Sequence, residues 1–142
     1  MFIFYILIFS KHGHLIASYH PENVTMEHEA DLLSGLFSAM QISYKASYDN
    51  PLLSMPGKKN RLYFFPDNKN DLIYAINCAF ISHMDIQIFL KKLRDIITTK
   101  FKIDGKNPCH IPNPILREIQ EILSNETQQL EHHVKTKYFI PK

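Results

Sequence analysis

The sequence predicts an α+β fold in which a five-stranded antiparallel sheet carries one helix on one face and two on the other. Two stretches, residues 2–9 and 72–81, are apolar at both alternating positions, so as strands they would be buried on both faces. Such strands belong at the centre of a sheet that is covered on both sides. Three other stretches place apolar residues at helical spacing, which supplies the covering layers. The predicted element order is strand, strand, helix, three strands, helix, helix.

The first two strands form a predicted hairpin. Residues 2–9, with the sequence FIFYILIF, lead through a turn at Gly13 into residues 15–19, and Pro21 then ends the pairing. An eight-residue apolar run is too short for a membrane helix, which needs about 20 residues. It also lacks the basic start and cleavage site of a secretory signal. We therefore expect a buried strand here and no membrane span.

The first helix is predicted to follow Pro21 and to end near Ser47. Thr25 is the expected N-cap, and Glu27 and Glu29 lie in the first turn, where the helix dipole favours negative charge. Its apolar residues recur at helical spacing and form one predicted core-facing stripe, made of Leu32, Leu33, Leu36, Phe37, Met40 and Tyr44.

A strip of small residues lies beside that stripe, and it consists of Ser34, Gly35, Ser38 and Ala39. Glycine inside a helix costs about 1 kcal/mol relative to alanine, so we expect Gly35 to permit a close approach to a neighbouring backbone. The four residues are the candidate partner-binding site. The alternative is that the strip packs on the chain's own sheet, and the sequence leaves both interpretations open.

Three strands are predicted next, over residues 52–55, 61–65 and 72–81, in an antiparallel meander. Pro56-Gly57 and Pro66-Asp67 supply turn residues between them. The third strand is expected beside the first strand of the chain in the middle of the sheet.

Two helices are predicted in the last third of the chain. Asp85 is the expected N-cap of the first, whose stripe is Ile86, Phe89, Leu90, Leu93, Ile96, Ile97 and Phe101. Gly105 ends this segment, and residues 107–112 form an expected extended connector with two prolines. Asn113 and Pro114 then signal a helix start. The second helix has the stripe Ile115, Leu116, Ile119, Ile122, Leu123, Leu130 and Val134.

The length of 142 residues suits one domain, which we place at residues 1–134, followed by a loosely held tail at 135–142. A net charge of +2, with lysines and arginines scattered, argues against a nucleic-acid partner. Tyr63 and its two phenylalanine neighbours could present an aromatic platform to RNA, but packing against a helix is the favoured interpretation. Cys78 and Cys109 make no disulfide framework, which favours a cytoplasmic location.

The sequence contains no recognisable set of metal-binding or catalytic residues. Five of the eight histidines, and Cys109, occur as adjacent or turn-bound pairs, whereas a zinc site needs three or four convergent ligands. These pairs are His12 with His14, Cys109 with His110, and His132 with His133. No nucleophile elbow or phosphate-binding glycine loop occurs either. We therefore expect no metal, no cofactor and no enzymatic activity.

The chain resembles a longin domain, a profilin-like fold found in some SNAREs, in adaptor small chains and in roadblock-like proteins described in archaea. The resemblance rests on the hairpin FIFYILIFSKHGHLIASYH, the helix EADLLSGLFSAMQISYKAS and the meander PLLSMPGKKNRLYFFPDNKNDLIYAINCAF. The phrase LLSGLFSAM followed by a short strand carries the roadblock-like part.

The resemblance implies a non-catalytic interaction module in vesicle trafficking or small-GTPase regulation. The implied partners are a small GTPase, a SNARE or another longin or roadblock domain, in a homo- or heterodimer. Such a protein would be cytoplasmic and would reach membranes through its partners. The alternatives are a small subunit of an adaptor-type vesicle coat, which the two C-terminal helices also resemble, and a small-ligand sensor domain.

Overall fold

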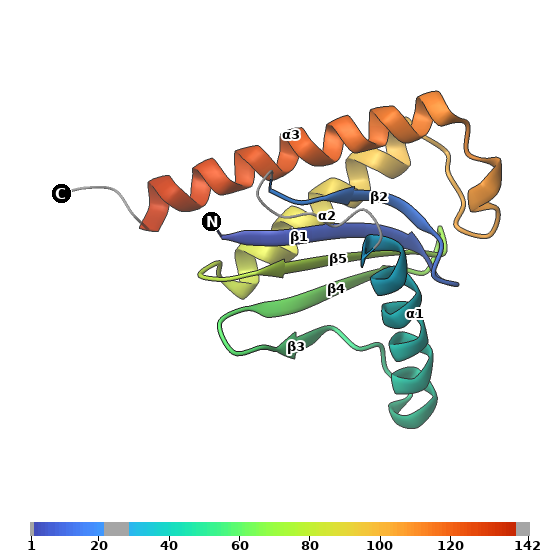
Figure 1. The fold of residues 1–142 in the computed structure, drawn as a ribbon, viewed down its shortest axis with the longest axis horizontal. Coiled ribbons are helices and arrows are strands. Elements are labelled where there is room, and N and C mark those ends of the chain that lie inside the picture. Colours follow the sequence, from blue (N-terminus) through green and yellow to red (C-terminus); the bar gives the residue numbers. More distant parts are fainter. Residues whose placement is uncertain (1, 22–28, 139–142) are drawn as a thin grey trace.

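A computed structural model describes residues 2–21 and 29–138. Its five strands form one sheet in the order β2-β1-β5-β4-β3, with α1 on one face and α2 and α3 on the other (Figure 1). The predicted fold class and element order are confirmed. The elements are β1 (Ile3–Ser10), β2 (Leu15–Tyr19), α1 (Glu29–Tyr48), β3 (Ser54–Pro56), β4 (Arg61–Asp67), β5 (Leu72–Cys78), α2 (His83–Lys100), the 3-10 turn η1 (Pro108–His110) and α3 (Asn113–Tyr138).

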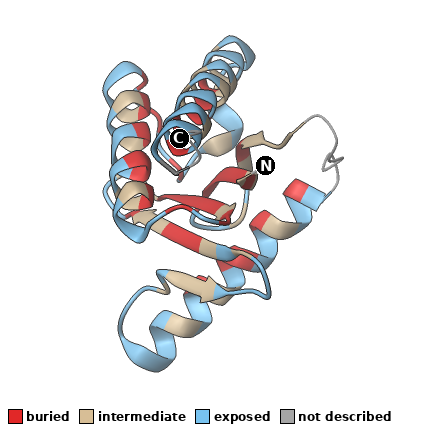
Figure 2. Cartoon of the chain, turned by 90° about the vertical axis from the view of Figure 1, so that its left-hand side faces the viewer, coloured by how far each residue is buried: buried red, intermediate tan, exposed pale blue. Residues whose placement is uncertain are grey.

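The central strands β1 and β5 pair antiparallel, as their two-sided apolar sequences predict. Ile6 lies opposite Ile76, and both side chains are fully buried. Along β1, Ile6 and Ile8 join the core under α2 and α3, whereas Leu7 and Phe9 join the core under α1. The buried residues therefore lie on both faces of the sheet (Figure 2). Two cores share one pair of strands, so the opening octapeptide needs no membrane to cover it.

Several strand limits differ from the prediction. The strand β3 begins at Ser54 rather than at residue 52, because the side-chain amide of Gln41 binds the backbone of Leu52. The strand β5 ends at Cys78 rather than at residue 81, and Phe80 then turns the chain with a φ of 62°. The strand β4 continues to Asp67.

The expected N-cap of α2 is wrong by three residues. Ser82 is the N-cap, and its hydroxyl accepts a hydrogen bond of 3.1 Å from the backbone N–H of Asp85. Asp85 lies in the first turn instead, where Lys137 of α3 donates to its carboxylate at 3.1 Å. Most of the predicted α2 stripe is buried as expected, namely Ile86, Phe89, Leu90, Leu93 and Ile97 with Phe101. The expected cap of α1, Thr25, and its neighbour Glu27 lie outside the described residues.

The segment between α2 and α3 is not wholly extended, because η1 lies within residues 107–112. The helix α3 begins at Asn113 as expected and reaches Tyr138, four residues beyond the proposed domain boundary at 134. Residues 139–142 of the proposed tail lie outside the described residues, and the division itself stays a prediction. Among residues 2–21 and 29–138, no helix is long and apolar enough to span a membrane.

Two buried titratable groups are expected to make the folded chain less stable at alkaline pH. The Tyr74 hydroxyl is buried without a hydrogen-bond partner among the described residues. Burial raises the pKa of Tyr74, with a further rise from the nearby Asp67 carboxylate. Burial also raises the pKa of the Cys78 thiol to about 12. Both groups stay protonated in the folded chain while the unfolded chain loses these protons above about pH 9 to 10. Folding stability should therefore fall as the pH rises through this range.

We expect Tyr74→Phe to lower this alkaline loss of stability without destabilising the protein at pH 7. The substitution removes a buried hydroxyl that has no partner in the described structure, so no hydrogen bond is lost. Urea unfolding at pH 7 and at about pH 10.5 measures both effects. Tyr48→Phe is the matched control, since Tyr48 is exposed. A clear loss of stability for Tyr74→Phe at pH 7 would contradict the prediction.

Candidate functional site

The inner face of α1 is built largely from small and polar side chains. Ser34 and Ser38 are buried against the sheet, with exposures of 0% and 3%. The Ser38 hydroxyl donates to the backbone carbonyl of Lys11 at 2.5 Å, and the Ser34 hydroxyl donates to that of Ala30 at 2.8 Å. Two of the four candidate partner-binding residues are therefore engaged within the chain. The other two, Gly35 and Ala39, are exposed.

The β1–β2 turn approaches α1 closely at a pair of glycines. Gly13 has a φ of 93°, and a Cβ built on it would lie 3.0 Å from the Cα of Gly35. Gly13 therefore needs both the left-handed backbone and the absence of a side chain. A Cβ on Gly35 itself would meet nothing within 4 Å. The predicted close approach of α1 to a neighbouring backbone is present. However, the missing side chain that allows it is that of Gly13, not that of Gly35.

The outer face of α1 is uncharged and partly apolar. The sequence predicts one core-facing stripe, but the structure divides it: Phe37 is buried, whereas Leu32 and Leu36 are 73% and 54% exposed. Residues 32–44 contain no charged side chain, so neither side of this helix stretch carries the usual solvated charges. We name as the α1 outer face the exposed residues Leu32, Gly35, Leu36, Ala39 and Ser43.

An open sheet edge lies near the C-terminal half of α1. The strand β3 pairs only with β4, so its other side has no partner strand in the described structure. Gln41 holds the chain segment that leads into β3. Its side-chain amide donates to the Leu52 carbonyl at 2.6 Å and accepts from the Leu52 N–H at 3.1 Å. A surface hollow of about 420 Å³ joins α1 to β3, lined by Met40, Ser43, Tyr44, Ser47, Tyr48, Leu52 and Met55.

The opposite edge of the sheet is closed by α3. The side-chain amide of Gln120 donates to the carbonyl of Ser18 at 2.5 Å and accepts from its N–H at 3.1 Å. A glutamine side chain thereby takes the place of a neighbouring strand at β2. An unpaired edge is a template for pairing with another chain, so closing β2 directs such pairing to β3.

We expect Gln120→Ala to lower the free energy of unfolding by about 1–2 kcal/mol, because two hydrogen bonds to the β2 backbone are lost. Chemical denaturation measures this loss. Gln128→Ala, an exposed position on the same helix, is the control and should change stability by less than about 0.5 kcal/mol. Equal effects for the two variants would show that the Gln120 contacts contribute nothing specific.

A second exposed apolar surface lies at the start of α2, on the other side of the sheet. Its three residues, Phe80, Met84 and Ile88, are 75%, 71% and 60% exposed. Met84 and Ile88 are one helical turn apart, as Leu32 and Leu36 are on α1. We call these three residues the α2 patch, and it offers a matched comparison for the α1 outer face.

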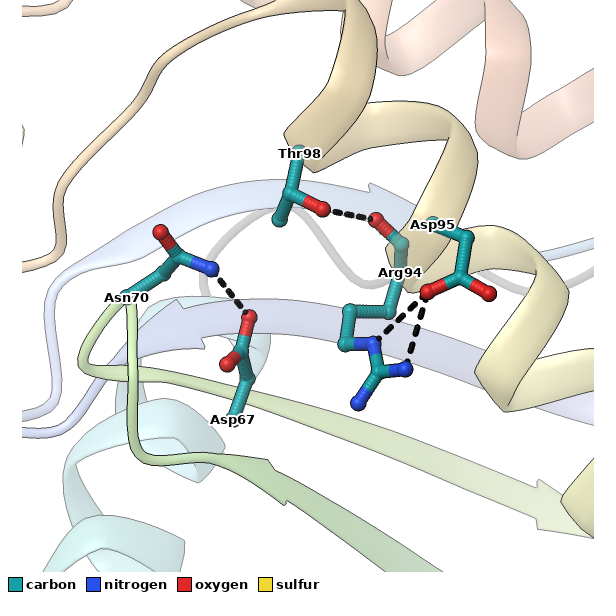
Figure 3. Close-up of polar contacts among 5 residues, drawn as sticks. All are labelled: Asp67, Asn70, Arg94, Asp95 and Thr98. Atoms are coloured by element: carbon teal, nitrogen blue, oxygen red, sulfur yellow. Dashed lines mark hydrogen bonds and ion pairs between the residues drawn. The ribbon is translucent and has the colours of Figure 1, made fainter.

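Polar residues gather between the β4–β5 turn and α2, but they are arranged as structural contacts (Figure 3). Asn70 donates to the buried Asp67 carboxylate at 2.8 Å. Arg94 donates to Asp95 through two nitrogens, at 3.0 Å and 2.8 Å, and lies 5.1 Å from the centre of the Phe65 ring. The group contains no nucleophile beside a general base, which is what covalent catalysis requires.

The other sequence candidates are not brought together. Among residues 2–21 and 29–138, no three histidine, cysteine or acidic side chains converge as metal ligands. Cys78 is buried and Cys109 is exposed. Of the aromatic run on β4, Tyr63 and Phe64 are buried, with exposures of 6% and 0%, so they are not available for base stacking.

Comparison with known proteins places this geometry in a family. The model of the Roadblock/LC7 domain matches residues 3–76, which is just over half of the 142-residue chain. This match confirms the roadblock-like part of the resemblance seen in the sequence. The comparison with curated proteins finds no match.

Several solved structures are similar to this chain. The mammalian SRP receptor is 12% identical, with a TM-score of 0.51 over 95% of this chain and 96% of that one. A Roadblock/LC7 domain from Streptomyces avermitilis is 10% identical, with a TM-score of 0.50 over 69% of this chain and 88% of that one. The gliding protein MglB from Thermus thermophilus is 10% identical, with a TM-score of 0.48 over 87% and 79%. At these identities the likeness to the SRP receptor and to the Streptomyces avermitilis domain concerns the fold alone.

Proposed function

Because the chain belongs to the Roadblock/LC7 domain family, we propose that it is a non-catalytic interaction module that pairs with another roadblock-like domain and acts in small-GTPase regulation. Domains of this family are generally non-catalytic regulatory modules. The longin-like resemblance of the sequence supports a small GTPase as the regulated partner. A cytoplasmic location, with membranes reached through that partner, is part of the same proposal.

The observations that carry the proposal are the α1 outer face and the open β3 edge, which lies near the C-terminal half of the same helix. Leu32 and Leu36 are mostly exposed on a helix stretch without charge. Burying a leucine side chain contributes about 1.5–3 kcal/mol, so an uncovered pair is a strong source of association energy. The open β3 edge, near the C-terminal half of α1, supplies unpaired backbone groups that a second sheet can use.

Pairing of two copies through this surface is self-complementary. A two-fold axis beside β3 would set the α1 outer faces of the two protomers against each other and bring the two open edges together. The strand β3 has only three residues and ends in Pro56, which lacks an N–H donor. Most of the buried area must therefore come from α1, with the strand edge fixing the register.

The oligomeric state and GTPase binding test the proposal separately. Light scattering during size-exclusion chromatography should give the mass of a dimer, or of a one-to-one complex with a roadblock-like partner. Titration with purified small GTPases, loaded in turn with GDP and with a non-hydrolysable GTP analogue, should show binding that depends on the nucleotide. A monomer that binds neither a roadblock-like domain nor any GTPase would overturn the proposal.

A further inference from the structure

Phe80 is exposed at a position where the backbone favours glycine. It lies in the connection between β5 and α2 with a φ of 62°, which is in the left-handed region. A bulky residue with such a φ is an outlier, and outliers persist only where the surrounding structure imposes them. Its neighbours Ala79 and Ile81 are both buried, and the Ala79 N–H donates to the Phe2 carbonyl at 2.8 Å. The chain therefore turns the Phe80 ring outward between two fixed neighbours.

The α2 patch to which Phe80 belongs lies at one end of the molecule, where three segments meet. Arg61 and Cys78 are cross-strand partners, so the β3–β4 turn and the β5–α2 connection leave the sheet at the same end. Lys137 donates to Asp85 at 3.1 Å, which brings the last turn of α3 to the start of α2. All three segments lie at the left of Figure 1, and Figure 2 views the molecule from that side.

This end of the molecule is basic. Its segments, residues 56–61, 79–88 and 131–138, contain five lysines and arginines against the two carboxylates of Asp85 and Glu131, which is a formal charge of +3. The whole chain carries +2, so the remaining residues together are net negative. All five cationic residues are exposed, namely Lys58, Lys59, Arg61, Lys135 and Lys137. The α2 patch is therefore bordered by cations, whereas the α1 outer face lies on a stretch without charge.

We propose that this end of the molecule binds directly to an anionic lipid surface, with Phe80 and Met84 inserted among the headgroups and the five cations contacting lipid phosphates and carboxylates. Burial of apolar side chains and attraction to anionic lipids are the two contributions to interfacial binding. A lipid surface also accepts an outward-turned ring without a complementary pocket, which favours lipid over an acidic protein as the occupant. This contact goes beyond membrane association through a partner.

The contact does not depend on the proposed pairing. The α2 patch and the α1 outer face lie over opposite faces of the sheet, so a paired chain keeps the α2 patch uncovered. Binding to vesicles and the mass of the particle are measured separately, which keeps the two proposals distinguishable.

Co-sedimentation of the full chain with lipid vesicles tests the proposal. The chain should bind phosphatidylcholine vesicles that contain phosphatidylserine and should not bind vesicles of phosphatidylcholine alone. Phe80→Asn removes the ring, and asparagine tolerates the left-handed backbone, so the variant should fold and bind at least about tenfold more weakly. Tyr48→Asn removes an exposed aromatic side chain at the end of α1 and is the matched control, which should bind as the unmodified chain does.

A second pair of variants tests the charges. Lys58→Gln combined with Lys59→Gln should weaken binding to the phosphatidylserine vesicles by about 10- to 30-fold. The control is Lys69→Gln combined with Lys102→Gln, which replaces two exposed lysines, one in the β4–β5 turn and one after α2. Both control positions lie away from the basic end, so this pair should weaken binding much less.

A tryptophan at position 80 tests insertion. The chain contains no tryptophan, so Phe80→Trp supplies a single fluorophore. Its emission should shift to shorter wavelength when phosphatidylserine vesicles are added, and lipids with brominated acyl chains should quench it. Tyr48→Trp is the control and should show neither change.

Three results would contradict the proposal. It is overturned if the unmodified chain does not bind the phosphatidylserine vesicles, or if Phe80→Asn binds them as well as the unmodified chain does. Bound Phe80→Trp that brominated lipids do not quench would overturn the insertion of this residue. Binding of soluble poly-glutamate that Phe80→Asn weakens equally would overturn the assignment to lipid in favour of an acidic protein.

Discussion

Leu32→Glu combined with Leu36→Glu is expected to convert the paired protein into monomers. Both side chains lie on the α1 outer face, and the pairing we propose would bury them. Losing the burial of two leucines per protomer costs about 3 kcal/mol or more, which corresponds to at least about 100-fold weaker association. Carboxylates facing each other across a two-fold axis would weaken it further. Sedimentation equilibrium of the unmodified and doubly substituted chains measures the change.

The control for this result is Met84→Glu combined with Ile88→Glu in the α2 patch. It replaces two exposed aliphatic residues one helical turn apart with the same two acids, so charge and loss of apolar surface are matched. Both double variants change exposed positions, so each should keep its free energy of unfolding within about 1 kcal/mol. Dissociation by the α2 pair but not by the α1 pair would move the pairing surface to the opposite side of the sheet.

The same two variants can locate GTPase binding. If the GTPase contacts the paired surface, the α1 substitutions should abolish both pairing and GTPase binding. If it contacts the α2 patch, pairing should persist in the α2 variant while GTPase binding is lost. The two surfaces lie over opposite faces of the sheet, so their substitutions should act independently.

The two central strands of the sheet are predictable because their sequences are apolar on both faces and must be covered on both sides. Residues 2–9 are apolar at every position, and only a strand with both faces covered can bury them. The same argument places β5 beside β1, as the pairing of Ile6 with Ile76 shows. Most of the α2 stripe was also predictable, since its apolar residues recur at helical spacing and five of them are buried: Ile86, Phe89, Leu90, Leu93 and Ile97.

The orientation of α1 could not be predicted in the same way. Its apolar residues occur on more than one side, and the helix places small side chains inward so that it can lie close to the sheet. The helical spacing of apolar residues predicts that Leu32 and Leu36 face the core. In the structure, Ser34 and Ser38 are buried near the β1–β2 turn instead. The signal that points to the exposed face is the absence of charge from residue 32 to residue 44.

The two glutamines that govern the sheet edges were also missed by sequence reasoning. Gln41 and Gln120 look like ordinary polar helix residues, and nothing local distinguishes them from Gln128. Their role depends on which backbone lies opposite, and Gln120 and Ser18 are 102 residues apart in the chain. Contacts of this range follow from the assembled tertiary structure and have no local sequence pattern.

A matched pair of glycine substitutions should change stability in opposite directions. Gly105 is buried in the segment after α2, and its N–H donates to the Asn70 carbonyl at 2.7 Å. A Cβ at this position would lie 2.0 Å from the backbone carbonyl oxygen of Asp71. Because backbone cannot move aside as a side chain can, Gly105→Ala must separate the segment from the β4–β5 turn. We expect a loss of about 2–4 kcal/mol, from overpacking and from the weakened hydrogen bond.

Gly35→Ala is the opposite case, since the added methyl group meets nothing within 4 Å and the helical backbone suits alanine. It should raise the free energy of unfolding by about 0.5–1 kcal/mol. Denaturant unfolding of both variants measures the two effects under the same conditions. If Gly35→Ala destabilised the chain, α1 would lie closer to the β1–β2 turn than described. If Gly105→Ala were neutral, the segment after α2 would be free to shift away from the β4–β5 turn.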